Sequence, residues 1–290
     1  MTARHVLPLL CAAALAGRAA PPSAEEAIAR WIDEPAPYAA SEGARTLPVA
    51  IGLFGAGAET GAPEDDVAGL RLGLVADHHN VGVLDLSLLY GHTGGRQRGL
   101  QLGAVNVAEG PLEGVQIGLL ASVSGVLAQS PSTGAQAALA ANYSDSLDGL
   151  QLALAFNRAG AGSGLQLAAG VNSSDRFRGI QVAAVNIDGK EIRGAQIGAI
   201  NAGAETFSGL QFGAINGCSG TFSGLQAGLL NTATTLDGVQ FGLFNLASTS
   251  RGWQIGLYND ARHAQGVQIG LANWSSDADL PLLPLVRASF

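Results

Sequence analysis

A short motif recurs along most of the chain, and its period restricts the fold more than any other feature. The motif places a glutamine between two small residues, as in "GLQFGAIN" (209–216) and "GLQAGLLN" (224–231). Most successive motif glutamines are 14 or 15 residues apart. A fixed period of this kind indicates that one structural unit is repeated, so the repeat is interpreted before any local motif.

The motif glutamines share the same neighbours. They are Gln101, Gln116, Gln136, Gln151, Gln166, Gln181, Gln196, Gln211, Gln226, Gln240, Gln254 and Gln268. An asparagine follows five or six residues after each glutamine, except in the unit of Gln116, which has Ala121 there. The residues one before, one after and three after each glutamine are apolar. This alternation indicates a strand with one apolar side, either buried or facing lipid.

Two architectures fit a strand and turn of this length. In a parallel β-solenoid each coil stacks on the previous one, and repeated Gln and Asn side chains form ladders. In an antiparallel meander each strand reverses direction. The motif is nearly palindromic about its glutamine, so Gln would still meet Gln after a reversal, and this favours the meander. The fold prediction is therefore an up-and-down antiparallel β-barrel of about 16 short strands, with a parallel β-solenoid as the alternative.

Weaker units extend the pattern to both ends of the domain. Ala50, Arg71 and Asp85 occupy glutamine positions upstream, and a last strand is expected near Val286 or Arg287. The total is then even, as in bacterial outer-membrane barrels. The central positions of four strand pairs are separated by 21, 16, 20 and roughly 19 residues instead of 14 or 15. The longer connections that this implies all follow odd-numbered strands, which places them on one rim. Against this interpretation, each strand carries only a short apolar band, whereas spanning a membrane takes ~25 Å.

Three charged residues at or near glutamine positions are the candidate site. Arg71 and Asp85 fall on neighbouring strands at the same height, so a cross-strand ion pair is expected. In a closed barrel Arg287 would lie near the first strand, in the same sector. The interpretations are an interior pair that fixes strand register, or lumen charges selective for small anions or zwitterions. The repeated glutamines are interpreted as structural, because each amide can both donate and accept hydrogen bonds.

The first 45 residues differ from the repeats. Residues 1–20 have the charged start, apolar stretch and small-residue end of a secretory signal peptide. Residues 21–45 are a linker, in which Ser23 opens a short amphipathic helix over 23–33. Residues 46–290 are the repeat β-domain.

Composition and motifs exclude several function classes. Only 13% of the 290 residues are charged and the net charge is −8, which argues against nucleic acid as a partner. No motif of a nucleophile with its base, of a phosphate loop or of a metal site occurs, so no catalytic residue, metal or cofactor is predicted. Asp77-His78-His79 is interpreted as a polar turn, and Cys218 as an isolated thiol.

The units "GVQIGLLA", "GAQIGAIN" and "GVQFGLFN" resemble an uncharacterised bacterial surface-repeat family built of GxQxGxxN units. The resemblance covers residues 82–290. It implies export and surface exposure, and it brings no catalytic residues.

The functional prediction is an exported, non-enzymatic protein of the outer membrane or cell surface. Its first form is a weakly selective pore, with membrane lipid and small solutes as partners. The alternative is a secreted or surface-displayed β-solenoid scaffold for protein or glycan interaction, in which a surface macromolecule binds through the longer loops.

Overall fold

The computed structural model describes residues 44–54, 60–128 and 130–289. The predicted signal peptide and the predicted helix at 23–33 lie outside these residues. The described residues form sixteen β-strands. They divide into two compact units, unit 1 (Met1–Asp145) and unit 2 (Ser146–Phe290).

The strands of unit 1 follow one another with short connections. They are β1 (Thr46–Phe54), β2 (Asp66–His78), β3 (Leu84–Thr93), β4 (Gln97–Ala108), β5 (Leu112–Ser124) and β6 (Ser132–Ala138). β7 (Ala141–Ala153) contains the boundary between the units.

Unit 2 continues the same series. Its strands are β8 (Phe156–Ala168), β9 (Val171–Val182), β10 (Val185–Ile197), β11 (Ile200–Ala202), β12 (Thr206–Phe212), β13 (Ile215–Ser250), β14 (Trp253–Ala264), β15 (Gly266–Trp274) and β16 (Leu282–Ser289). β13 is long because its hydrogen bonding continues around more than one coil.

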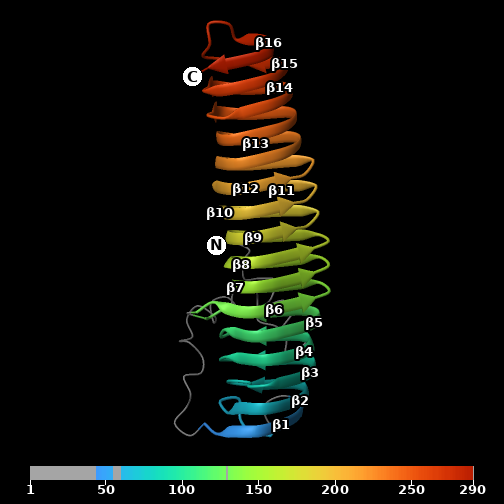
Figure 1. Cartoon of the computed structure of the whole chain (residues 1–290). Helices are drawn as coiled ribbons and strands as arrows, with labels where there is room; N and C mark the ends of the chain where they lie inside the picture. Colours follow the sequence, from blue (N-terminus) through green and yellow to red (C-terminus); the bar gives the residue numbers. More distant parts are fainter. Residues whose placement is uncertain (1–43, 55–59, 129, 290) are drawn as a thin grey trace, which may run out of the picture. The chain divides into compact units, whose positions relative to one another are not determined.

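Neighbouring coils pair in parallel and in register. In unit 2, β12 places Gln211 beside Gln196 of β10 and Gln226 of β13. The asparagines pair in the same way, as Asn201 of β11 does with Asn216 of β13. Figure 1 shows the coils from β8 to β15 stacked one above the next. Each repeat is therefore one full coil, and the fold is a parallel β-solenoid.

The predicted antiparallel barrel is wrong, and the glycines on either side of the glutamine explain the error. Gly209 has φ +137° and lies so close to the Gly194 carbonyl that a Cβ would clash with it. Gly213, on the other side, also lies close to a backbone carbonyl, that of Gly198, and beside the Asn201 amide of the previous coil. Of the two glycines only Gly209 has a positive φ, so they are not equivalent and the palindrome does not reflect a reversal of the chain.

The chain bends within the motif as well as between motifs. Around Gln211, one interruption lies at residues 203–205, between β11 and β12, and the other is the bend at Gly213 and Ala214, between β12 and β13. The Asn201 Nδ2 atom donates to the Phe212 carbonyl at 3.0 Å, just before this bend. Because a buried backbone carbonyl needs a partner, the asparagine supports the bend.

The interior of the coils is largely polar. Every repeat glutamine is at most 2% exposed, and the repeat asparagines are fully buried. An apolar cluster fills only the middle of unit 2, where Phe207 and Phe222 stack with ring centroids 5.2 Å apart. The inside of each coil is occupied by side chains, so the predicted lumen has no counterpart here.

β16 is the one strand that pairs in the antiparallel direction in the described chain. It lies against β15, with Arg287 opposite Gln268. Leu285 adopts φ 66° beside a register shift in this pair. β16 does not pair with β1, because the order of strands is open and ends at each of them. The predicted closure near Arg287 is therefore wrong.

Candidate functional site

The glutamines form a continuous hydrogen-bonded ladder along the interior of each unit. Gln211 Nε2 donates to Gln196 Oε1 at 2.7 Å, and Gln226 Nε2 donates to Gln211 Oε1 at 2.8 Å. Each amide therefore donates to the coil before it and accepts from the coil after it. Such a chain aligns the amide dipoles, and aligned hydrogen bonds polarise one another.

The asparagines form a second ladder with the opposite direction. Asn201 Nδ2 donates to Asn216 Oδ1 at 2.8 Å, and Asn216 Nδ2 donates to Asn231 Oδ1 at 2.9 Å. Here each amide donates to the coil after it. The dipoles of the two ladders oppose each other, so their fields partly cancel inside the solenoid.

A charged residue lies beside the terminal glutamine of the ladder in each unit. In unit 1, Gln101 Nε2 donates to the Asp85 carboxylate at 2.8 Å, so the donor end of the ladder meets a negative charge. In unit 2, Gln268 ends the ladder: its Oε1 atom is buried and accepts no hydrogen bond, although Arg287 lies opposite it in register. Arg287 Nη2 donates instead to the carbonyls of Leu280 and Pro281. The charge therefore binds the ladder directly at Asp85 and not at Arg287.

Arg71 and Asp85 form an ion pair with no exposed side-chain surface. Arg71 Nε donates to Asp85 Oδ1 at 2.9 Å, and its Nη2 atom donates to Oδ2. Arg71 Nη1 also donates to the His92 carbonyl at 2.6 Å. Ser87 and Gln101 donate to the same carboxylate. The buried charges are thus both paired and hydrogen-bonded, as burial requires.

A second charged cluster lies on the asparagine side of unit 1. His92 Nδ1 contacts Asp77 at 2.7 Å and Nε2 contacts Glu109 at 3.4 Å, while Tyr90 stacks on the ring at 6.3 Å. Burial opposes a charge on His92, but the hydrogen bonds from its ring to the two carboxylates raise its pKa to about 9. The imidazolium is therefore a structural cation at neutral pH.

Unit 2 contains a buried carboxyl group, Asp188, without an equally close cation. Burial raises its pKa to about 7, although Gln181 and Gln196 donate to it and Arg158 attracts it. Asp188 accepts hydrogen bonds from two glutamines of the ladder, Gln181 and Gln196. Gain or loss of its proton therefore changes the hydrogen bonding of the ladder.

Sequence reasoning located the repeat glutamines, Arg71 and Asp85, but it missed the partners of the charges. It placed Ala121 in the asparagine column, whereas the structure places Ser122 opposite Asn106. His92 and Glu109 were not identified, because they approach Asp77 only when successive coils stack. The one available signal was their spacing of about one repeat period.

The outer surface of unit 2 carries an apolar face made of three columns. Its residues are one before each repeat glutamine (Leu150, Leu165, Ile180, Ala195, Leu210, Leu225, Val239, Trp253, Val267), one after it (Leu152, Leu167, Val182, Ile197, Phe212, Ala227, Phe241, Ile255, Ile269) and three after it (Leu154, Ala169, Ala184, Ala199, Ala214, Leu229, Leu243, Leu257, Leu271). None of these residues is buried. Phe241 is 58% exposed and Leu271 is 68% exposed.

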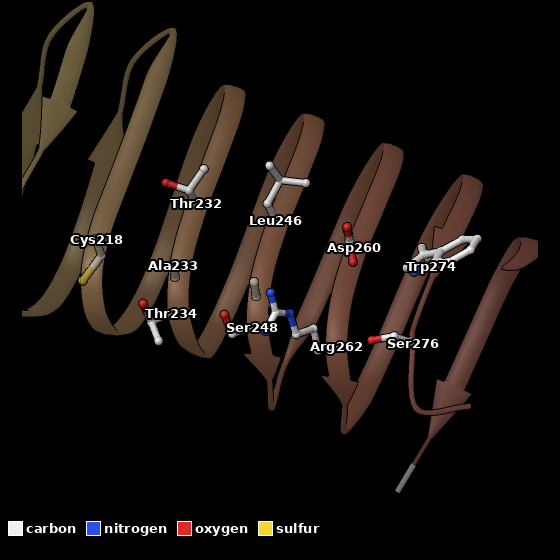
Figure 2. Close-up of a pocket in the computed structure, with 11 residues that line it drawn as sticks. Cys218, Thr232, Ala233, Thr234, Leu246, Ser248, Asp260, Arg262, Trp274 and Ser276 are labelled. Atoms are coloured by element: carbon white, nitrogen blue, oxygen red, sulfur yellow. The ribbon is translucent and has the colours of Figure 1, made fainter. Parts of the chain in front are cut away.

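A shallow groove of about 450 Å³ lies on another side of unit 2. Figure 2 shows two rows of side chains along it, one with Thr232, Leu246, Asp260 and Trp274 and one with Thr234, Ser248, Arg262 and Ser276. Cys218 and Ala233 lie between the rows. Hydroxyl, carboxylate, guanidinium and indole groups thus face one groove.

Neither a metal site nor a relative assigns a function to this chain. Among the described residues, no cluster of three His, Cys, Asp or Glu side chains could hold a metal ion. In the same part of the chain, no helix is long and apolar enough to cross a membrane. The resemblance to GxQxGxxN surface-repeat proteins stays a prediction. Family models, curated proteins and solved structures give no match to this chain.

Proposed function

We propose that this chain is an exported, non-enzymatic scaffold that binds another macromolecule through the apolar face of unit 2. The proposal rests on one observation: polar side chains fill the inside of the coils, and apolar side chains lie on their outer surface. Gln211 and Asn216 point inward, whereas Leu210 and Phe212 point outward. A soluble monomer rarely exposes so large a contiguous apolar surface unless that surface binds something.

The polar interior supports a structural rather than a catalytic function. Gln211 uses its amide to donate to one neighbouring coil and to accept from the other. A catalytic acid, base or nucleophile has to reach a substrate, but these amides are buried between coils. The export component rests on residues 1–20, which have the pattern of a signal peptide.

The experiment combines localisation with binding. The full chain with a C-terminal epitope is expected in the medium or on the surface of intact bacteria, where added protease removes the epitope. The purified chain is expected to bind a partner or surface, and replacing Leu210 and Phe212 by Asp should abolish that binding. Retention in the cytoplasm, or binding that is insensitive to these substitutions, would contradict the proposal.

The groove of unit 2 favours a glycan as a second candidate partner. Trp274 is 39% exposed beside Asp260 and Arg262. An aromatic ring with nearby hydrogen-bonding groups is suited to a sugar, because the ring packs on its apolar side while the polar groups bind its hydroxyls. A glycan array on the purified chain tests this candidate. Any bound sugar should be lost on Trp274→Ala and retained on Trp253→Ala, which lies outside the groove.

A further inference from the structure

We propose that the apolar face of unit 2 packs against the apolar face of a second copy of this chain. The inference rests on the proposed scaffold function and names its partner. It concerns the three columns defined above, and it requires nothing of unit 1.

The size of the face suits a weak dimer. Coils stack at ~4.8 Å, so the coils from Gln151 to Gln268 extend over ~40 Å. The columns one before and one after the glutamine lie on the straight strand and, with their side-chain width, cover ~10 Å, while the third column lies at the bend. Two faces of roughly 400 Å² would bury ~800 Å² together, which is the range of weak interfaces.

The composition of the face matches the centre of a homodimer interface. Its columns contain no charged residue, and such interfaces are depleted of charge in their core. The next outward column along the strand is polar and includes Asp148, Arg178, Arg193 and Asp237. A polar rim beside an apolar core is the usual arrangement. The rim has charges of both signs, whereas a surface that binds anionic lipid would need a cluster of basic residues.

The spacing of the side chains is matched by a second copy of this chain. Leu210 and Leu225 lie side by side in register on successive coils, so the face consists of ridges that repeat with the coil rise. Two sheets interdigitate over their whole length only when their ridges have the same period. Another copy of this chain has that period by construction.

The relief of the central column is also self-complementary. Ala227 lies between Phe212 and Phe241, which are 39% and 58% exposed. The small residue leaves a recess between two projecting rings. In a pair of antiparallel copies with the two-fold axis near this coil, a projecting side chain of the partner can enter the recess.

The test is the mass of the purified full chain in solution, measured by light scattering after size exclusion and by sedimentation equilibrium. A dimer is expected at micromolar concentration. Phe212→Asp combined with Phe241→Asp should give a monomer, with the dissociation constant raised at least a hundredfold. The control Thr206→Asp introduces the same charge at an exposed position outside the face and the groove, and it should remain dimeric. Circular dichroism verifies the β-sheet content of each variant.

A second pair of variants keeps the test decisive if the aspartate variant does not fold. Ala227→Trp fills the recess without adding charge and should also weaken the dimer, whereas Ala202→Trp, outside the face, should not.

A monomeric parent chain overturns the inference. If that monomer binds vesicles of phosphatidylglycerol and phosphatidylethanolamine, and the Phe212→Asp and Phe241→Asp variant does not, the scaffold function survives without the dimer. If the monomer does not bind the vesicles, both the dimer and the binding function of the apolar face fail. A dimer that tolerates every face variant also overturns the inference.

Discussion

Arg71 and Asp85 lie side by side on adjacent coils of unit 1 and form a completely buried ion pair. Both residues occupy positions that hold glutamine in later coils. The pair therefore takes the place of two glutamines in the ladder. The Asp85 carboxylate accepts a hydrogen bond from Gln101, which is the next residue of the ladder.

Replacing Arg71 by Met should destabilise the protein strongly. The substitution leaves the Asp85 carboxylate buried without its cation, which typically costs ~3–5 kcal/mol. The combined change Arg71→Gln and Asp85→Gln restores the ladder pattern and should recover most of this loss. Urea denaturation followed by circular dichroism measures both variants. A cost below ~1 kcal/mol for the single change would show that the pair is dispensable.

Replacing Gln211 by Leu should interrupt the ladder in unit 2. The change leaves the Gln196 Oε1 acceptor without its donor and leaves Gln226 Nε2 with only the Thr232 carbonyl as acceptor. A buried polar group without a partner costs ~1–3 kcal/mol. Gln265→Leu is the control, because Gln265 is exposed and outside the ladder. The midpoint of urea unfolding should fall for the first variant only. Equal midpoints for the two variants would mean that the ladder adds no stability.

Replacing Gly209 by Ala should be more damaging than its small volume suggests. The backbone has φ +137°, and the new Cβ would lie 1.9 Å from the Gly194 carbonyl oxygen. Strain and overlap together should cost more than ~3 kcal/mol or prevent folding. At Gly217 the nearest atom to a Cβ is 3.2 Å away and belongs to a side chain, so Gly217→Ala is the matched control. Thermal unfolding of both variants provides the comparison, and similar melting temperatures would contradict the close stacking of Gly209 on Gly194.

Asp188 should make the stability of the protein fall as pH rises from about 4 to about 7. Its pKa is about 7 in the folded protein and 3.8 as the reference value, so the folded state holds the proton more tightly. The stabilisation is fully present below the reference pKa and is lost as pH rises through the folded pKa. Asp188→Asn should remove this dependence and stabilise the protein at pH 8 by a few kcal/mol, since each pKa unit corresponds to ~1.4 kcal/mol.

The control for Asp188 is Asp279→Asn, which changes an exposed carboxyl group. Urea unfolding at a series of pH values measures the difference between each variant and the parent chain. If the difference for Asp188→Asn does not grow with pH, the carboxyl is already ionised at neutral pH and the proposed coupling to the ladder is wrong.

How much the sequence could predict depends on the range of the interactions concerned. The all-β repeat was predictable, because the alternation about Gln211 is local and requires an extended backbone. The contacts of His92 with Asp77 and Glu109 were not, since they join three successive coils. The outward direction of Phe212 was predicted only as one of two alternatives, because an apolar column is either buried or on the outer surface, and the structure places it on the outer surface.

The sequence by itself determined the period, the strands and the columns of Gln and Asn that pair with themselves. Only the tertiary structure decided between reversal of the chain and continued coiling. Both arrangements pair Gln with Gln, so the motif alone does not distinguish them. The decision lies in two non-local contacts, the stacking of Gly209 on the Gly194 carbonyl and the bond from Asn201 to the Phe212 carbonyl. These contacts bend the chain within each repeat, place the amides inside and leave the apolar columns outside.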